Sequence, residues 1–353
     1  MNPSLGPQQD ALVYFTYGKD CYHQEARFSI ISALLLSPEQ TPAFSIAVYT
    51  DRADFFLDLP VQVHSVSAAQ AHAWQGPHGY NHRSKHEVMR LALAQYRTAI
   101  FIDSDTYFTQ APQALFARTG PGKLLVNVIA ASKRTQSSAL MLNLSRQIEQ
   151  LGLNLETLQQ TNSGVMGIHH DDAGLLDESL RLMDELYLPS GQHYTMEEFA
   201  LALAGQRRQL QLNECPDLLH HYWSRKAIYR AKVLAYLGKH PTPLQSPSAS
   251  NDLALVTPTL PKPPASYRLQ SKLLAFSLAK AYRQLFIEIR YGLYPYSNEF
   301  DRACLTAWLD KARQNAEEKQ PGFLLEPALR AVLRRLPTSL RQSVREHYLP
   351  SAH

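Results

Sequence analysis

Two aspartates follow a short apolar segment and have the spacing of a metal site. Ala99–Ile102 is a run of four apolar residues, and Asp103 and Asp105 come directly after it, separated by one residue. Two carboxylates at the end of a buried strand repel each other unless a cation or a hydrogen-bond donor compensates their charge. Carboxylate oxygens are the ligands that Mg²⁺ and Mn²⁺ prefer. The pattern predicts a divalent ion, Mn²⁺ or Mg²⁺, held by Asp103 and Asp105; a solvated turn is the alternative.

Two kinds of phosphate chemistry use paired aspartates after an apolar strand. Phosphatases of the haloacid-dehalogenase type place a threonine two residues after the second aspartate. Here Thr106 follows Asp105 immediately, and Tyr107 occupies the required position. Their strand also usually lies near the start of the domain, whereas this one lies well inside the chain. The phosphatase interpretation is therefore disfavoured; the second chemistry is the transfer of a sugar from a nucleoside diphosphate.

Several other segments place polar or charged side chains beside predicted strands and helices. Thr16 and Tyr17 end the first apolar strand, Leu12–Tyr17, and Asp51 follows the second one. Lys85 opens a predicted helix, which is the unfavourable end for a cation, so we expect a specific partner for it. Amide, carboxylate and imidazole side chains come later in the chain, in Asn162-Ser163-Gly164, Glu197-Glu198 and His220-His221.

The order of these segments resembles that in glycosyltransferases with the GT-A fold. FIDSDTYF, residues 101–108, resembles the DxD loop that binds a divalent metal and the pyrophosphate of a nucleotide-sugar. The resemblance covers roughly residues 10–235, is nearest to the glycogenin-like and galactosyltransferase-like branch, and leaves the C-terminal residues outside it. The other matching segments are ALVYFTYGKDCY (11–22), AVYTD (47–51), HRSK (82–85), TNSGVMGI (161–168), YTMEEF (194–199) and LHHYWSRK (219–226).

The resemblance implies a metal-dependent glycosyltransferase, a hexosyltransferase that moves a sugar from a nucleoside-diphosphate sugar, a UDP-sugar, to an acceptor hydroxyl. The metal ligands would be Asp103, Asp105 and His221, with His220 as the alternative imidazole. Glu197, Glu198 and Lys85 would act in catalysis, and the acceptor would be a glycan, a lipid-linked molecule or a protein. The implied nucleotide-sugar site consists of Thr16, Tyr17, Asp51, Lys85, Asp103, Ser104, Asp105, Asn162, Ser163, Gly164 and Lys226.

Each of these motifs is also compatible with a purely structural role. Asn162–Gly164 is compatible with a turn in which Gly164 adopts a positive φ. Glu197 and Glu198 lie at a predicted helix start, where carboxylates interact favourably with the helix dipole. The segment Trp223–Arg225 replaces a stretch that usually contains glycine in the glycogenin-like branch, so backbone contact with phosphate is less favoured there.

Short apolar strands alternate with helical patterns up to about residue 240, which predicts an α/β fold. Strands are indicated at Ser45–Tyr49, Val61–Val66 and Leu124–Ala130, and the sheet should be of the GT-A type, Rossmann-like, mixed but mostly parallel, and flanked by helices. Ligands of such sheets bind beyond the carboxyl ends of the strands.

Three regions are predicted along the chain: a nucleotide-sugar-binding GT-A catalytic domain at 1–240, a proline-rich linker at 241–268, and a basic helical appendage at 269–353. Seven of the 22 prolines lie between Pro241 and Pro264, and proline favours extended backbone. Residues 251–353 contain 15 Lys and Arg against 9 Asp and Glu, a net charge of +6 in a chain of net charge +4.

The composition narrows the classes of protein. Three separate cysteines argue against a disulfide framework and fit a reducing compartment. The absence of a CxxC pair argues against a zinc site built from cysteines. Met1–Asp10 lacks the pattern of a secretory leader, and no apolar run reaches a membrane-spanning length. We expect a cytoplasmic protein with no transmembrane segment and no nucleic-acid partner. The basic C-terminal helices are compatible with peripheral contact with the inner membrane face, although a solvated helical surface is the favoured interpretation. A nucleotidyltransferase of related fold and a non-catalytic nucleotide-sugar-binding protein remain as alternatives.

Overall fold

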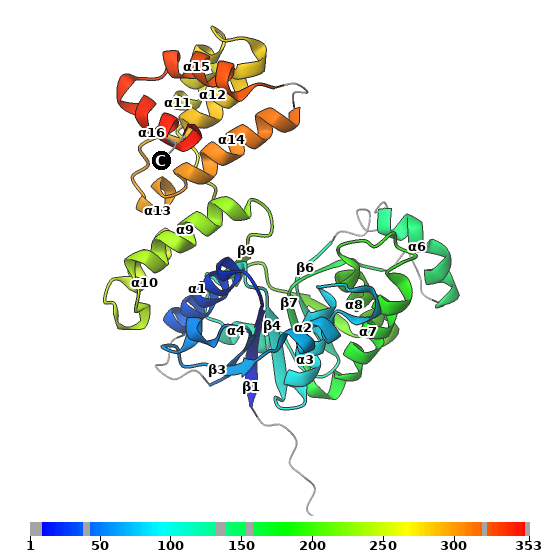
Figure 1. The fold of residues 1–353 in the computed structure, drawn as a ribbon. Coiled ribbons are helices and arrows are strands. Elements are labelled where there is room, and N and C mark those ends of the chain that lie inside the picture. Colours follow the sequence, from blue (N-terminus) through cyan, green and yellow to red (C-terminus); the bar gives the residue numbers. More distant parts are fainter. Residues whose placement is uncertain (1–8, 38–42, 131–138, 153–157, 320–322, 350–353) are drawn as a thin grey trace, which may run out of the picture. The chain divides into compact units, whose positions relative to one another are not determined.

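The computed structural model describes residues 9–37, 43–130, 139–152, 158–319 and 323–349. The chain divides into two compact units, one ending at His221 and one beginning at Tyr222. The predicted catalytic domain and C-terminal region both include residues outside these described ranges. The elements of the first unit are shown in Figure 1: β1 Asp10–Thr16, α1 Asp20–Leu36, β2 Ser45–Thr50, β3 Gln62–Ser65, α2 Ala68–Trp74, α3 Arg83–Leu93, β4 Thr98–Ile102, β5 Thr106–Phe108, α4 Gln113–Ala117, β6 Lys123–Ile129, α6 Ala139–Gln150, β7 Thr161–His169, α7 Gly174–Leu186, α8 Met196–Arg207, β8 Gln211–Glu214 and β9 Leu219–His221.

The first unit contains a seven-stranded sheet in the order β3-β2-β1-β4-β7-β6-β8. Neighbouring strands are parallel from β3 to β4 and between β6 and β8. Strand β7 is the exception, because it runs antiparallel to both β4 and β6. The predicted fold class, an α/β protein with a mixed, mostly parallel sheet flanked by helices, is confirmed.

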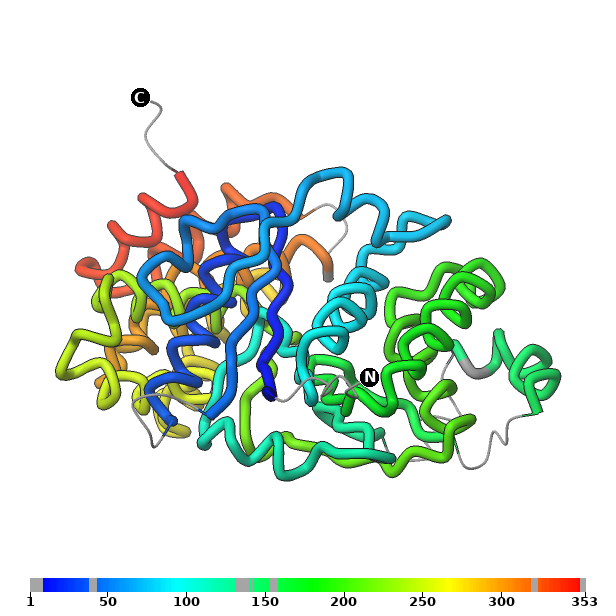
Figure 2. Tube along the Cα trace, turned by 90° about the horizontal axis from the view of Figure 1, so that it is seen from below, coloured from blue at the N-terminus to red at the C-terminus, as the bar shows by residue number. Residues whose placement is uncertain are grey.

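Both faces of the sheet are covered, as the alternation of β1 shows. Ala11 and Val13 belong to a core that includes buried residues of α3, α7 and α8, and these helices lie together in Figures 1 and 2. Tyr14 points to the opposite face, where its hydroxyl lies 3.1 Å from Ser29 Oγ of α1. A strand buried on both faces has nearly continuous apolar sequence, which is why β1 and β4 could be recognised from the sequence.

The second unit is helical, and Figure 1 shows its elements: α9 Lys226–Lys239, α10 Ala249–Leu255, α11 Ala265–Ala275, α12 Lys280–Gly292, α13 Glu299–Arg302, α14 Leu305–Lys319, α15 Leu325–Arg335 and α16 Thr338–Tyr348. Its core is formed mainly by apolar residues of α12, α14, α15 and α16. None of the helices in the described part of the chain has both the length and the apolar character that crossing a membrane requires.

The proline-rich segment differs from the extended linker that its composition predicts. It contains a 3₁₀ turn, Pro243–Gln245, and the helix α10. The Tyr236 hydroxyl of α9 donates a hydrogen bond to the carbonyl of Ala249, 3.0 Å away, and Ala249 is fully buried. Prolines flank the helix and do not interrupt it, so the segment folds with α9, and the second unit begins well before residue 241.

Candidate metal and donor site

The two predicted aspartates occupy the short loop between β4 and β5. All five residues of β4 are buried, so the strand delivers Asp103 to the carboxyl edge of the sheet. The Thr106 hydroxyl holds this loop against α1. It donates a hydrogen bond to the Asp103 carbonyl at 2.8 Å and lies 3.0 Å from Ser29 Oγ of α1. Asp105 is 5% exposed. The carboxylates therefore sit on a rigid support instead of a solvated turn.

The segment Asn162–Gly164 is part of strand β7, which excludes the alternative of a turn. Gly164 has no positive φ; it lies next to Asp103, whose backbone N–H donates to the Gly164 carbonyl at 2.9 Å. Because β7 is antiparallel to β4, its amino end lies at the same edge as the carboxyl ends of the parallel strands. This reversal brings the amide and hydroxyl groups of the segment to the aspartates.

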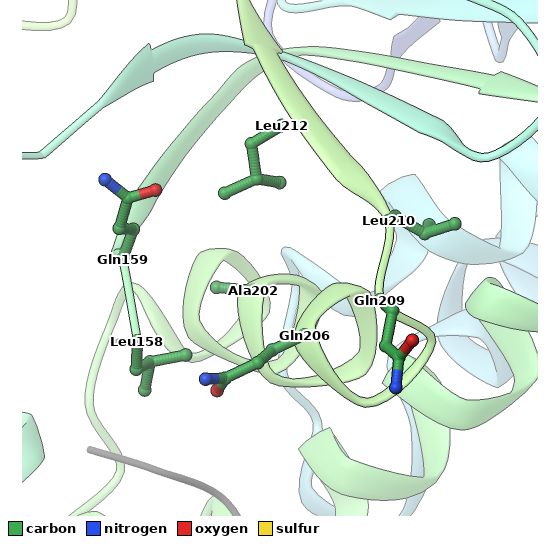
Figure 3. Close-up of a pocket in the computed structure, with 7 residues that line it drawn as sticks. All are labelled: Leu158, Gln159, Ala202, Gln206, Gln209, Leu210 and Leu212. Atoms are coloured by element: carbon green, nitrogen blue, oxygen red, sulfur yellow. The ribbon is translucent and has the colours of Figure 1, made fainter. Parts of the chain in front are cut away.

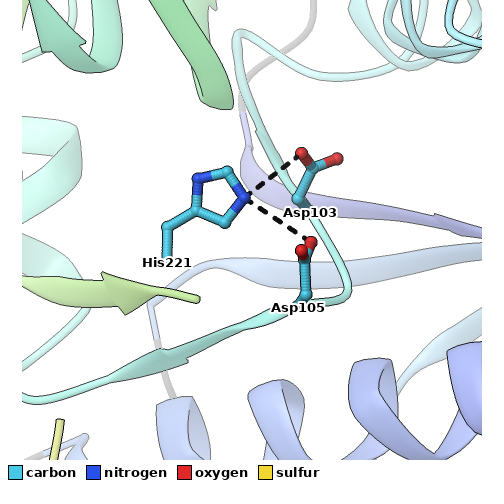
Figure 4. Close-up of side chains that lie close together, drawn as sticks. All are labelled: Asp103, Asp105 and His221. Carbon is cyan, nitrogen blue, oxygen red and sulfur yellow. Dashed lines mark ion pairs between the residues drawn. The ribbon is translucent and has the colours of Figure 1, made fainter. Parts of the chain in front are cut away.

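Strand β9 brings the predicted histidine to the same place. It pairs with β5 so that His221 lies opposite Thr106 and His220 opposite Tyr107. Successive side chains of a strand point to opposite faces, and His220 packs edge-on against the Tyr107 ring with a centroid separation of 5.4 Å. His221 Nε2 lies 3.5 Å from Asp105 Oδ1 and 3.8 Å from Asp103 Oδ2 (Figure 4). The geometry selects His221 over His220.

The three side chains fit a divalent ion. One ligand atom from each of Asp103, Asp105 and His221 can be chosen so that all lie within 4.8 Å of one another. Asn162 Oδ1 lies 3.0 Å from His221 Nδ1, which leaves Nε2 turned toward the carboxylates. A hydrogen-bond partner on the ring nitrogen that does not bind the metal commonly orients the imidazole of a metal-binding histidine. Two carboxylates with one imidazole suit a first-row ion such as Mn²⁺ better than Mg²⁺, which prefers oxygen ligands.

The expected partner of Lys85 is Asp103. Lys85 is the third residue of α3, and its Nζ donates to Asp103 Oδ2 at 2.9 Å and lies 3.7 Å from Glu197 Oε1. Burial works against the charged ammonium, but the neighbouring carboxylates Asp103 and Glu197 outweigh it and raise the pKa of Lys85. A cation at the unfavourable end of a helix is thus held by two acids of the site.

Removing the charge of Lys85 should destabilise the first unit. In Lys85→Met, Asp103 and Glu197 lose their compensating cation, and we expect the free energy of unfolding without metal to fall by about 3 kcal/mol. The measurement is denaturant unfolding in EDTA. The matched control is Lys123→Met, which removes a partly exposed lysine that has no ion pair among the described residues. An equal change in both variants would contradict the assignment.

The acidic pair opens α8 and accepts hydrogen bonds from the site. Glu198 Oε1 accepts from Asn162 Nδ2 at 2.8 Å and from the Ser163 backbone N–H at 3.2 Å. Glu197 Oε1 accepts from the Ser163 hydroxyl at 3.2 Å, and its other oxygen accepts from the Tyr80 hydroxyl. These contacts link the pair to the segment beside Asp103, so the two glutamates do more than favour the helix dipole.

Glu198 should make the stability of the protein depend on pH. Burial, and then the charge of Glu197, raise its pKa from the ordinary value of 4.5 to about 8. A raised pKa stabilises the folded state fully below the unfolded pKa, and this contribution is lost as the pH rises toward the folded pKa. Relative to Glu198→Gln, the wild type should therefore lose up to about 1.4 kcal/mol per pH unit between pH 5 and 8 in EDTA.

The measurement is the difference in free energy of unfolding between the two proteins across that pH range. Glu185→Gln, at an ion-paired and half-exposed position on α7, serves as the control and should show a difference that hardly varies with pH. A difference for Glu198→Gln that is constant from pH 5 to 8 would contradict the raised pKa.

The residues predicted for the nucleotide lie at the ends of β1 and β2. The Thr16 hydroxyl is buried and has no hydrogen-bond partner among the described residues, whereas Tyr17 is partly buried against the core. Asp51 accepts from the Gly18 N–H at 3.2 Å and lies 2.9 Å from His23 Nε2. Gly18 has a φ of +93°, so Asp51 fixes a loop that needs glycine. A contact of Asp51 with a base or ribose stays a prediction.

The roles of two further residues also stay predictions. Ser104 lies between the aspartates and is half-buried, and it remains a predicted nucleotide-sugar ligand. Lys226 is exposed and begins α9 in the second unit, and its contact with phosphate is likewise a prediction.

Sequence reasoning missed several contributors to the site. Tyr80 donates to Glu197 and to the Tyr194 carbonyl, the latter at 2.7 Å. His82 Nδ1 lies 3.9 Å from Glu197 Oε1, and His23 is fully buried beside Asp51. Tyr80 and His82 both lie within five positions of Lys85, and His82 also begins the matched segment HRSK, so these were the signals in the sequence that could have indicated them.

A separate pocket of about 350 Å³ lies between the C-terminal half of α8, β8 and the start of β7 (Figure 3). Its walls carry no ionisable side chain, and its first lining residue on α8, Ala202, lies about one helical turn after Glu198. The lining residues are Leu158, Gln159, Ala202, Gln206, Gln209, Leu210 and Leu212. The pocket offers no group for acid–base or metal chemistry, so the candidate site is the cluster around Asp103.

Comparison with known proteins gives little beyond the fold. No protein-family model and no curated protein matches the sequence. Among solved structures, the crystal structure of mouse xyloside xylosyltransferase 1 in its apo form is similar, with 12% sequence identity and a TM-score of 0.41. The similarity covers 59% of this chain and 85% of that chain. At this score the likeness assigns no activity to the chain.

Proposed function

We propose that the protein is a metal-dependent glycosyltransferase that transfers a sugar from a nucleoside-diphosphate sugar to an acceptor hydroxyl. The observation that carries the proposal is the Asp103–Asp105–His221 cluster at the carboxyl edge of the sheet, in contact with Lys85. The order of the motifs, which resembles that of GT-A enzymes, supports the same interpretation. Within that family the motifs are most similar to the glycogenin-like and galactosyltransferase-like branch, which favours a UDP-sugar as the donor.

The chemistry requires positive charge where the diphosphate leaves. A divalent ion held by Asp103, Asp105 and His221 would supply that charge when it is bound. Lys85 is the fixed cation of the site, and its ammonium is already oriented by Asp103 and Glu197. Preorganised charges of this kind stabilise a developing anion because they need not reorient during the reaction.

The acidic pair and the neighbouring amide serve the sugar and the acceptor. Asn162 and Ser163 offer donors and acceptors that match sugar hydroxyls, and Gly164 permits close approach. Glu198 is a buried carboxyl with a raised pKa, so its ionised form is a stronger base than an ordinary glutamate. We assign Glu197 and Glu198 to orienting the acceptor hydroxyl and accepting its proton. The acceptor belongs to glycans, lipid-linked molecules or proteins.

The test is product analysis with a panel of nucleotide-sugars in the presence of Mn²⁺ and in EDTA. We expect release of a nucleoside diphosphate that depends on the metal and that is accelerated by an acceptor. With a nucleoside triphosphate and a sugar 1-phosphate in place of the nucleotide-sugar, release of pyrophosphate would instead identify a nucleotidyltransferase. Tight binding of UDP without any turnover would identify a non-catalytic binding protein, and either result would overturn the proposal.

A further inference from the structure

The helix α11 exposes a line of large apolar side chains. Leu269, Leu273 and Phe276 follow the spacing i, i+4 and i+7, which places them on one stripe of the helix and its C-terminal cap. Their exposed fractions are 59%, 60% and 66%. Scattered exposed leucines are normal in proteins, but three in a continuous stripe within eight residues indicate a surface that contacts something apolar.

Basic side chains run beside this stripe. Arg268 and Lys272 are exposed, and each directly precedes a leucine of the stripe, so they form a second line next to it. Residues 253–287 contain five Lys and Arg and neither Asp nor Glu. We call Arg268, Leu269, Lys272, Leu273 and Phe276 the α11 outer face. Its charge is of one sign only.

The opposite side of α11 is fixed to α12. Ser271 is fully buried, and its hydroxyl accepts from Arg290 Nε of α12 at 2.9 Å. The guanidinium of Arg290 also lies 4.6 Å from the centre of the Tyr267 ring. The α11 outer face is therefore the solvent-exposed side of a helix that α12 holds in place. Its apolar and its basic side chains are exposed on the same side.

The end of the stripe shows the same pairing of apolar and basic groups. The guanidinium of Arg283 lies 5.2 Å from the centre of the Phe276 ring, and its Nη2 donates to the Phe276 carbonyl at 3.3 Å. The contact holds Phe276 at the helix end with a cation beside it. An aromatic ring held next to a cation suits the boundary between acyl chains and anionic headgroups.

From these observations, the geometry points to a binding site for an anionic membrane surface on the α11 outer face. A helix that combines an apolar stripe with lysine and arginine lies in the plane of the interface, and both terms contribute to its binding. A protein partner or a second copy would have to supply a uniformly acidic and apolar surface. An anionic membrane provides both an acidic surface and an apolar interior. We therefore infer the membrane as the occupant from its charge complementarity with the α11 outer face.

The experiment is sedimentation of the full-length protein with vesicles in EDTA, so that it depends on neither donor nor metal. Binding is expected to vesicles of phosphatidylcholine and phosphatidylglycerol in equal amounts, and to be lost in high salt or with phosphatidylcholine alone. Lys272→Glu should lower the partition coefficient about tenfold, because each basic residue near such a surface contributes about fivefold. Phe276→Ser should lower it by a similar factor through lost apolar contact.

Matched variants in the same unit separate the face from its overall charge. Arg334→Glu in α15 and Leu324→Ser before that helix change exposed positions outside the α11 outer face, and both variants should bind within about twofold of the wild type. If these controls lost vesicle binding to the same extent, binding would depend on the overall charge of the protein and not on the α11 outer face, and the proposal would be overturned. It is also overturned if anionic vesicles are not bound, or if the protein self-associates without vesicles and Phe276→Ser abolishes that association.

Discussion

Replacing Asp105 with asparagine should lower the affinity for Mn²⁺ by about 100-fold or more and abolish metal-dependent turnover of a nucleotide-sugar. Asp105 is buried on a loop fixed from α1, and its carboxylate lies 3.5 Å from His221 Nε2. The substitution keeps the size of the side chain but removes its charge, and changes to supporting groups alone cost about 10–100-fold in metal affinity. The measurement is calorimetric titration of the metal-free protein with Mn²⁺.

The matched control is Asp177→Asn, an exposed position in the first turn of α7. It should bind Mn²⁺ as the wild type does, and circular dichroism should be unchanged in both variants. Unaltered Mn²⁺ affinity in a folded Asp105→Asn protein would remove the aspartate from the metal site. Asp103→Asn should behave like Asp105→Asn, although it also releases Lys85 from its ion pair.

The substitution Gly164→Ala should displace His221 and weaken metal binding by about 10-fold or more. A Cβ at residue 164 would lie 2.2 Å from His221 Nδ1 and 2.4 Å from its Cε1, distances at which the imidazole must move. The ring is nearly buried and its Nδ1 is paired with Asn162, so it has little room to shift without losing its direction toward the carboxylates. Calorimetric titration with Mn²⁺ measures the effect.

Gly120→Ala provides the control, because a Cβ there meets nothing within 4 Å and the backbone φ is not positive. Combining Gly164→Ala with His221→Ala separates displacement from a general loss of structure. If the glycine acts through the imidazole, the double variant should bind Mn²⁺ no more weakly than His221→Ala alone. Additive losses would show that Gly164→Ala damages the site by another route.

The strands that could be predicted are those buried on both faces of the sheet, because their sequence is continuously apolar. Ala99–Ile102 and the two acids after it indicated both β4 and the centre of the site, because paired carboxylates are costly at the end of a buried strand unless a cation compensates them. A helix that begins at Lys85 was predicted, and a specific partner of Lys85 was expected because a cation is unfavourable at a helix start. These features are local, so they can be recognised from neighbouring residues.

The features that the sequence left open depend on pairing between distant segments. Asn162–Gly164 has the composition of a turn, and only the antiparallel course of β7 places it in a strand beside Asp103. The choice of His221 over His220 depends on the register of β5 with β9, in which a shift of one residue exchanges the two faces. The β5–β9 register joins residues more than 100 positions apart, the β4–β7 register joins residues more than 60 positions apart, and neither has a local signature.

The proline-rich segment shows how composition can mislead. Seven prolines suggested extended backbone, yet those near α10 precede or follow the helix, where proline is tolerated. Tyr80 was missed for another reason: its hydroxyl reaches Glu197, a residue 117 positions later, and nothing in its neighbours indicates that contact. Long-range hydrogen bonds of single side chains become visible only with the fold.

Crystals of the full chain soaked with Mn²⁺ and UDP would show whether the cluster holds a metal, through the anomalous scattering of manganese. We expect one strong peak coordinated by Asp103, Asp105 and His221 Nε2, at about 2.0–2.5 Å from each ligand atom, with diphosphate oxygens completing the sphere. No peak between these three side chains at saturating Mn²⁺ and UDP, or a peak held by other residues, would contradict the proposed metal site.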